Sequence, residues 1–171
     1  MYGNDPFHDT EDRLLIVVRH GDAGVKGGCD GPDLLRPLSL AGYRQAEGLV
    51  IQLEDYPVER IVSSPAVRCR ETVQPLAHDR MLEVEAAAAL GVDAGPAQVR
   101  ALLEDQGLRN AVLCTHGETI GQLFIQLAVA SLERSGPLQW PKGSTWLLQR
   151  TRLRVHARYL PPLAVDPAPA S

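Results

Sequence analysis

The sequence has few cysteines and no excess of basic residues. Its 171 residues include three cysteines, an odd number with no CxxC pair, which argues against a disulfide framework and against a zinc site. We interpret the thiols as reduced. Acidic residues outnumber basic residues by 21 to 17, and the formal net charge is −4, so no global positive field favours nucleic acid. Any anion-binding site must therefore be local.

Long apolar runs and a secretory leader are also missing. No stretch approaches the roughly 20 apolar residues that span a bilayer, and residues 1–13 are polar, unlike the apolar centre of a signal peptide. We expect a cytoplasmic protein with no membrane contact. The content of 44% hydrophobic and 22% charged residues is typical of one globular domain. We expect this domain over 14–160, after a flexible leader over 1–13 and before a disordered Pro/Ala-rich tail over 161–171.

Apolar, β-branched runs alternate with helical patterns along the chain. Residues 14–18 and 111–115 read LLIVV and AVLCT, which is typical of strands buried on both faces. Shorter strands are expected over 60–62 and 81–85, followed by two late strands over 144–149 and 153–159. This alternation predicts an α/β fold with a parallel or mixed sheet that helices cover on both faces.

Capping residues and periodicity predict four helices. Ser39 is a suitable N-cap for a helix with one apolar face, formed by Leu40, Tyr43, Ala46, Leu49, Val50 and Leu53. Ser64 and Pro65 predict a helix that begins at Pro65. Because Pro75 disfavours the helical conformation in the residue before it, this helix is expected to end near Gln74. Two further helices are expected over 97–106 and 118–132.

A histidine–glycine pair follows each of the two buried strands. These pairs are His20-Gly21 and His116-Gly117. Ligands of α/β sheets bind at the carboxyl ends of the strands, and glycine lets the backbone approach a ligand closely. A helix that begins near Gly117 would also direct N–H groups and its positive end toward an anion.

Two arginines are expected beside these histidines. Arg19 directly precedes His20, and Arg68 lies in the first turn of the helix predicted to begin at Pro65. Guanidinium groups match phosphate oxygens in bidentate contacts. Two arginines and two histidines at strand ends and helix starts therefore predict a compact positive pocket for phosphate.

The order of these motifs resembles that of the histidine phosphatase superfamily, branch 1, the phosphoglycerate mutase-like group. The resemblance extends over about 14–119 and rests on three motifs, namely Leu15 to Gly21, Ser63-Ser64-Pro65 with Arg68 and Thr72, and Thr115-His116-Gly117. Residues 19–23 with 36–39 are similar to small SixA-type phosphohistidine phosphatases. Residues 142–146 are similar to the phosphatase module joined to a Nudix hydrolase in some bacterial proteins. The resemblance implies a three-layer sandwich with a mostly parallel sheet.

The resemblance also implies a metal-independent phosphatase that needs no cofactor. Neutral His20 attacks phosphorus in line, and water hydrolyses the resulting phosphohistidine. Arg19, Arg68 and His116 hold the equatorial oxygens in place of a metal. Further substrate contacts are expected from Gly21, Gly117 and Ser63. The implied substrate is a phosphomonoester or a phosphoramidate such as phosphohistidine, carried by a small molecule or a phosphoprotein.

The leaving-group acid is the least defined part of the expected site. Family members that act on alcohol phosphates usually have a carboxylic acid, often Glu, after the strand that follows the SSP helix. Val92 occupies that position here, and Asp93 is the nearest substitute. Glu83 and Glu85 are alternatives within a predicted strand. A phosphoramidate has a good leaving group, so a weak acid favours a phosphatase over a mutase.

Two other functions stay open at this point. A phosphoglycerate mutase-type isomerase would need a retained phosphohistidine and a leaving-group acid, and a non-catalytic phosphate-binding module would need neither. Substrate specificity is expected from 22–35, from 91–96 and from the surroundings of Trp140. Trp140 and Trp146 either line the mouth of the pocket or belong to the core. Glu118 is interpreted as complementing the positive end of its helix.

Overall fold

The structure is a computed structural model that describes residues 13–28, 30–128, 132–151 and 154–165. A seven-stranded sheet in the order β3-β2-β4-β1-β6-β7-β5 forms its centre. The strands are β1 (Arg13–Arg19), β2 (Arg60–Ser63), β3 (Val84–Ala86), β4 (Ala111–Thr115), β5 (Leu132–Ser135), β6 (Thr145–Arg150) and β7 (Val155–Leu160). Neighbouring strands pair in parallel, except that β6 is antiparallel to both β1 and β7. The mostly parallel sheet predicted above is confirmed.

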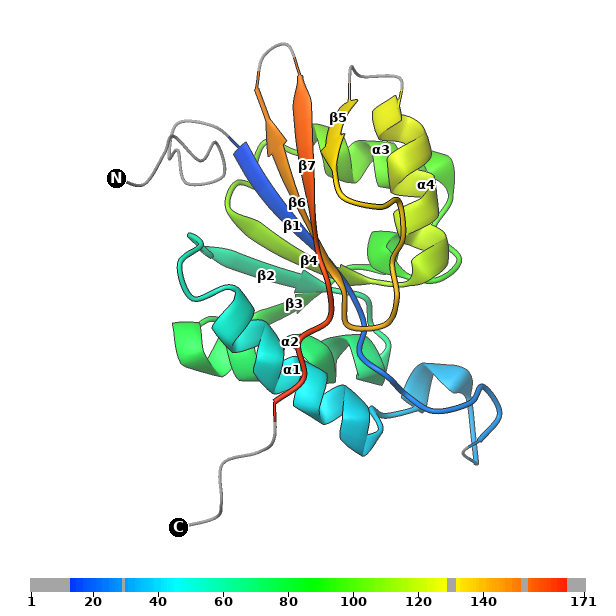
Figure 1. Cartoon of the computed structure of the whole chain (residues 1–171). Coiled ribbons are helices and arrows are strands. Elements are labelled where there is room, and N and C mark those ends of the chain that lie inside the picture. Colours follow the sequence, from blue (N-terminus) through cyan, green and yellow to red (C-terminus); the bar gives the residue numbers. More distant parts are fainter. Residues whose placement is uncertain (1–12, 29, 129–131, 152–153, 166–171) are drawn as a thin grey trace.

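Helices cover both faces of the sheet, so the molecule has three layers (Figure 1). One face carries α1 (Leu40–Gln52) and α2 (Val67–Arg80), and the other carries α3 (Pro96–Glu104) and α4 (Gly117–Ala128). Two short 3-10 helices, η2 (Asp33–Leu35) and η3 (Ala88–Leu90), lie in the connections. No helix within the described ranges combines the length and the hydropathy needed to cross a lipid bilayer.

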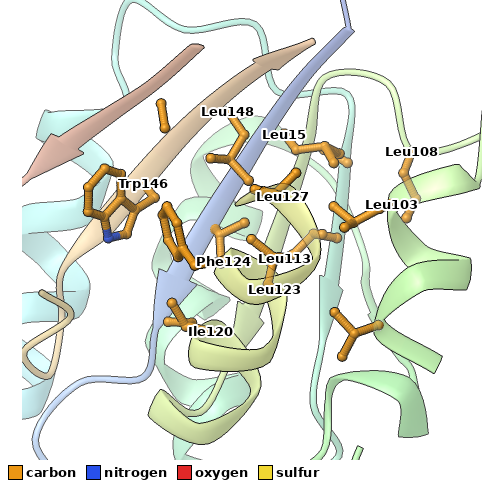
Figure 2. Packing of buried hydrophobic residues seen from close by; sticks show 14 of the residues in the cluster. Leu15, Leu103, Leu108, Leu113, Ile120, Leu123, Phe124, Leu127, Trp146 and Leu148 are labelled. Carbon is orange, nitrogen blue, oxygen red and sulfur yellow. The ribbon is translucent and has the colours of Figure 1, made fainter. Parts of the chain in front are cut away.

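The sheet separates two hydrophobic clusters, because successive side chains of a strand point to opposite faces. On β1, Leu15 and Val17 pack toward α3 and α4 (Figure 2), whereas Leu14, Ile16 and Val18 pack toward α1 and α2. All five side chains are at most 4% exposed. Burial on both faces explains the continuous apolar run of this strand. It also holds the residues that follow the strand at a fixed edge of the sheet.

Helix α1 has the predicted cap but a different buried face. The Ser39 side chain accepts a hydrogen bond from the backbone N–H of Gly42, as an N-cap does. Leu40 and Tyr43, however, are 65% and 44% exposed, so the prediction that they belong to the buried face is wrong. The buried apolar side chains lie further along the helix, where Ala46 is fully buried and Leu49 packs in the same cluster as residues of β1.

Helix α2 begins two residues later than predicted. Its first residue is Val67, and Ala66 occupies the N-cap position without a side-chain cap. The hydroxyl of Ser64 instead lies 2.9 Å from Nε2 of His116. The predicted start at Pro65 is therefore wrong by two residues, although the same hydroxyl also accepts from the backbone N–H of Ala66 (3.3 Å), as a cap does.

The same helix also ends later than predicted. It continues through Pro75 to Arg80, although an internal proline removes a backbone hydrogen bond and crowds the preceding turn. The next two residues, Leu76 and Ala77, are fully buried in the cluster between the helix and the sheet. The predicted end near Gln74 is wrong because this packing outweighs the local preference.

Boundaries of the remaining elements also differ from the prediction, and the helix expected over 97–106 spans Pro96–Glu104. The helix expected over 118–132 ends at Ala128 as described, and Leu132 begins strand β5. That strand was not predicted because it is a polar edge strand that pairs only with β7. The strand expected over 81–85 is shorter, since Met81 adopts a left-handed conformation at the end of α2. The two late strands are confirmed as β6 and β7.

The segment after β7 lies along α1. The backbone N–H of Val165 donates a hydrogen bond of 3.1 Å to the carbonyl of Arg44. The expected disorder is therefore wrong for 161–165, where contacts with the helix replace solvent. The rest of the tail, 166–171, and the leader over 1–12 lie outside the described residues.

Candidate active site

The carboxyl ends of β1, β2 and β4 meet at one edge of the sheet, because these strands are parallel neighbours. His20 follows β1, His116 follows β4, and Ser64 follows β2. Backbone hydrogen bonds join these ends, from His20 N to Thr115 O (3.0 Å) and from Ser64 N to Cys114 O (2.9 Å). The two histidine rings lie edge to face, with centroids 5.3 Å apart. The structure thus brings together both histidines singled out in the sequence.

His20 is neutral, and among the residues that the structure describes its Nε2 has no hydrogen-bond partner. Its side chain is buried, and Nδ1 lies 2.8 Å from the carbonyl oxygen of Gly21. Because that oxygen can only accept, Nδ1 carries the proton and Nε2 retains its lone pair. Burial is the main cause that lowers the pKa of His20 to about 3, and the hydrogen bond to Gly21 opposes it. Smaller electrostatic contributions that lower this pKa come from His116, Arg68 and Arg19.

Thr72 on α2 fixes the backbone that orients His20. Its hydroxyl accepts a hydrogen bond from Gly21 N (2.9 Å) and donates one to Arg68 O (2.6 Å). The side chain is 1% exposed. Because the carbonyl of Gly21 binds Nδ1 of His20, Thr72 holds the imidazole in place through one intervening residue. Thr72 lies within the second motif, and the sequence alone gives it no role.

Arg68 reaches the same edge of the sheet from α2. Its Nη2 lies 3.4 Å from Nδ1 of His116 and 3.1 Å from the Asp33 carboxylate, and Nη1 donates to the backbone carbonyl of Asp33 (2.7 Å). Within the described residues, its buried Nε has no hydrogen-bond partner. Arg68 is therefore oriented from two sides while one of its donors stays unused.

Arg19 lies against the start of α4. Its Nη1 donates to the carbonyl of Trp140 (2.7 Å), and its buried Nε has no partner in the described part of the chain. A Cβ at Gly117 would lie 3.1 Å from Cζ of Arg19, so glycine makes room for the guanidinium here. Burial lowers the pKa of Arg19 and Glu118 raises it. The unused donor of Arg19 is thus close to the N–H groups that begin a helix.

His116 has a partner at each ring nitrogen. Nε2 lies 2.9 Å from the hydroxyl of Ser64, which can donate or accept, and Nδ1 lies 3.4 Å from Nη2 of Arg68. Ser63, which we expected to contact phosphate, is fully buried and donates its hydroxyl to the carbonyl of Ser64 (2.9 Å). Its phosphate contact stays a prediction, whereas Ser64 is a site residue that the sequence analysis read as a helix cap.

Asp93 lies in the loop between η3 and α3 and is exposed. Its loop is fastened on both sides of His116, because Thr115 donates to the carbonyl of Leu90 (2.6 Å) and Thr119 to that of Gly91 (2.8 Å). The role of Asp93 as the acid stays a prediction.

Asp33 is a second site residue that the sequence analysis missed. It lies in η2, where its carboxylate contacts both Arg36 (2.8 Å) and Arg68. The hydrogen bond from Arg36 is the main cause that lowers the pKa of Asp33, and the charge of Arg68 adds to it. The carboxylate is therefore ionised at neutral pH. Only the spacing of an acidic and a basic residue three positions apart could have suggested the first of these contacts.

The arrangement suits an anion beside a nucleophile. Arg19 and Arg68 act electrostatically on His20 and each has a buried Nε–H without a partner in the described residues, and α4 begins directly after His116. Helix N-termini and guanidinium groups both favour bound oxyanions. In the described residues, no three or more His, Cys, Asp or Glu side chains are arranged to hold a metal ion.

A family model and a curated relative match this chain. Residues 15–91 match the histidine phosphatase superfamily (branch 1). Over 147 residues the chain is 36% identical to an 8-oxo-(d)GTP phosphatase of Mycolicibacterium smegmatis, a match that covers 81% of this chain and 45% of that protein. The chain therefore spans less than half the length of this curated relative.

Solved structures with the same fold cover nearly the whole chain. SixA from Agrobacterium tumefaciens has a TM-score of 0.68 and 21% identity, over 88% of this chain and 98% of that one. SixA from Nakamurella multipartitia has a TM-score of 0.66 and 25% identity, over 90% and 98%. A mycobacterial glucosyl-3-phosphoglycerate phosphatase has a TM-score of 0.62 and 20% identity, over 90% and 100%. With these motifs at the predicted strand ends, residues 15–91 of the chain belong to branch 1 of the histidine phosphatase superfamily.

Proposed function

We propose that this protein is a phosphatase that transfers a phosphoryl group first to Nε2 of His20 and then to water. The observation that carries this proposal is the neutral, buried imidazole of His20, whose Nδ1–H is bound to Gly21 and whose Nε2 is free. Neutral imidazole is the nucleophilic form of histidine. A buried histidine with this geometry beside two arginines is ready to attack an electrophilic phosphorus.

The chemistry divides into two displacements. In the first, the Nε2–P bond forms while the bond from phosphorus to the leaving group breaks, and the leaving group takes the electron pair. The Nδ1–H of His20 stays bound to the carbonyl of Gly21, which stabilises the positively charged phosphoimidazole. In the second, water attacks phosphorus, the P–N bond breaks, and inorganic phosphate and one proton are released.

Three side chains stabilise the charge that builds up on the equatorial oxygens. These are Arg19, Arg68 and His116, which we call the phosphate clamp. Preorganised donors of this kind lower the barrier because they need no rearrangement during the reaction. In this proposal the two guanidinium groups supply the positive charge that a metal ion supplies in other phosphoryl-transfer enzymes. The substrate is a phosphomonoester or a phosphoramidate, and names of the relatives support both nucleotide and phosphohistidine substrates.

The main experiment follows hydrolysis of p-nitrophenyl phosphate and of a phosphohistidine peptide with EDTA present. The His20→Ala variant should lose at least about 10³-fold in kcat, because the reaction loses its covalent nucleophile. The exposed His78→Ala variant serves as the matched control. A phosphoryl group trapped on the wild-type protein should be acid-labile and base-stable. Equal activity of wild type and His20→Ala, or activity only with added metal, contradicts the proposal.

Asp93 is proposed as the proton donor for poor leaving groups, because its loop is fastened beside His116. General acid catalysis contributes about 10²-fold or more when the leaving group is an alkoxide. The Asp93→Asn variant should therefore lose at least tenfold more activity on glycerol phosphate than on p-nitrophenyl phosphate. Equal losses on both substrates would remove Asp93 from this role.

A further inference from the structure

A shallow groove leads away from the phosphate clamp along the surface of α4. Its volume is about 420 Å³, which is within the range of small-molecule sites. The groove is lined by Arg19 and Gly117 at the clamp end, by Glu118, Gln122 and Ile125 along the helix, and by Trp140, whose ring lies beside Gly121 of α4. Since Arg19 belongs to both the clamp and the groove, a group attached to a clamped phosphate enters the groove directly.

The groove has the length and polarity of a nucleoside site. From Gly117 to Ile125 the helix rises about 12 Å at 1.5 Å per residue. The side chains at 118, 122 and 125 share one helix face, because they are four and three residues apart. Polarity decreases along this face, from the carboxylate of Glu118 through the amide of Gln122 to Ile125, which is 60% exposed.

Trp140 forms a rigid aromatic wall of this groove. Its backbone carbonyl accepts from Arg19, and its ring lies parallel to the buried Phe124, with centroids 6.0 Å apart and an interplanar angle of 12°. Phe124 in turn packs against the fully buried Trp146 at 4.7 Å, and both are labelled in Figure 2. A ring held by contacts of this kind loses little conformational entropy when a ligand stacks on it.

We propose that this groove binds the leaving group of the substrate, and that this leaving group is a nucleoside whose base stacks on Trp140. The substrate class is then a nucleoside 5′-monophosphate, a statement that rests on the phosphatase function proposed above. With its phosphate in the clamp, the ribose lies beside Glu118, where a carboxylate accepts hydrogen bonds from ribose hydroxyls, as acidic residues do in nucleotide-binding folds. The amide of Gln122 offers one donor and one acceptor to the edge of the base.

The test compares two ligands that differ only in the base, guanosine 5′-monophosphate and ribose 5-phosphate. Both are titrated calorimetrically into the His20→Ala protein, which does not turn them over. Stacking of a base on an aromatic side chain should make the nucleotide bind about tenfold more tightly than the sugar phosphate. Adding Trp140→Ala should reduce this ratio to below about two, and Trp140→Phe should retain most of it. Ile51→Ala, an exposed change on α1, is the matched control and should leave the ratio unchanged.

The ratio of two affinities cancels any general loss of phosphate binding in the variants. A ratio below two in the His20→Ala protein overturns the inference, and so does a ratio that survives Trp140→Ala. Hydrolysis of p-nitrophenyl phosphate by the wild-type protein is measured separately. Its absence refutes the phosphatase proposal while the titration still reports on the groove, so the two failures are distinguishable.

Discussion

His20 makes the stability of the protein depend on pH. Its pKa is about 3 in the folded protein, against an ordinary value of 6.5. Between these values the unfolded chain binds a proton that the folded protein does not, so stability falls as the pH drops from 6.5 toward 3. One such group changes the free energy of unfolding by up to about 1.4 kcal/mol per pH unit.

The variant His20→Asn should remove this dependence. The difference in unfolding free energy, variant minus wild type, is expected to grow in favour of the variant as the pH is lowered from 7 to 4. Urea unfolding at a series of pH values measures it, with the exposed His78→Asn as the control. A difference that does not change with pH would contradict the low pKa of His20.

Thr72 should control activity without touching the substrate. Replacing its hydroxyl in Thr72→Val leaves the buried N–H of Gly21 without its acceptor, which costs about 1–3 kcal/mol of stability. Because the carbonyl of Gly21 orients His20, we also expect kcat to fall about tenfold with little change in KM. Thr72→Ser keeps the hydroxyl and should restore both properties, as measured by steady-state kinetics and urea unfolding. An unchanged kcat in Thr72→Val would show that Thr72 stabilises the fold but does not orient His20 for catalysis.

At the scale of single residues, the site residues that could be predicted from the sequence are those that lie directly at strand ends. His20 and His116 could be located because each follows an apolar run that is recognisable in isolation. The contacts of Ser64 and Asp33 could not be predicted, because a serine before proline and an acid in a loop have several local uses. Which partner each of them meets depends on segments distant in the chain.

At the scale of elements, the proline inside α2 shows how tertiary packing can outweigh the tendency of proline to end a helix. Pro75 interrupts the backbone hydrogen bonds of a helix that nevertheless continues to Arg80. Pro75→Ala restores an N–H donor and relieves crowding, so we expect an increase of about 1–3 kcal/mol in unfolding free energy. Urea denaturation measures this, and Gln74→Ala, an exposed neighbour, is the control. No gain in stability would mean that the proline makes compensating contacts.

The element boundaries show where sequence patterns stop being informative. Strands β1 and β4 were predicted because burial on both faces leaves a continuous apolar run. Strand β5 was missed, since its residues are mostly exposed and its pairing with β7 alone defines it. Leu40 shows the opposite error, because it has helical spacing with the other apolar residues of α1 but is 65% exposed.

At the scale of the whole molecule, Gly48 allows the C-terminal segment to lie on α1. A Cβ at this position would come within 2.0 Å of the carbonyl oxygen of Leu163. Gly48→Ala should therefore destabilise the protein by about 1–3 kcal/mol, although alanine is the better helix former. Limited proteolysis should also cut within 161–165 faster than in the wild type. Glu47→Ala, an exposed change in the same helix, is the control. A Gly48→Ala variant that is more stable than the wild type would show that the C-terminal segment does not contact the helix closely at this position.

The layered architecture was predictable, but the order of the strands was not. Alternating strands and helices imply helices on both faces of a sheet. The central position of β1 between β4 and β6 instead depends on pairings between segments far apart in the chain. No local pattern specifies which buried strand lies next to which.

The pairing of β1 with β4 also has a kinetic consequence. His20 and His116 are 96 residues apart in the chain, and they meet only when these two strands align. Closing a loop of this length is entropically costly, and contacts of such high sequence separation slow folding. The two histidines therefore become neighbours only once the centre of the sheet has assembled. A partly folded chain in which β1 and β4 are not yet paired has no active site.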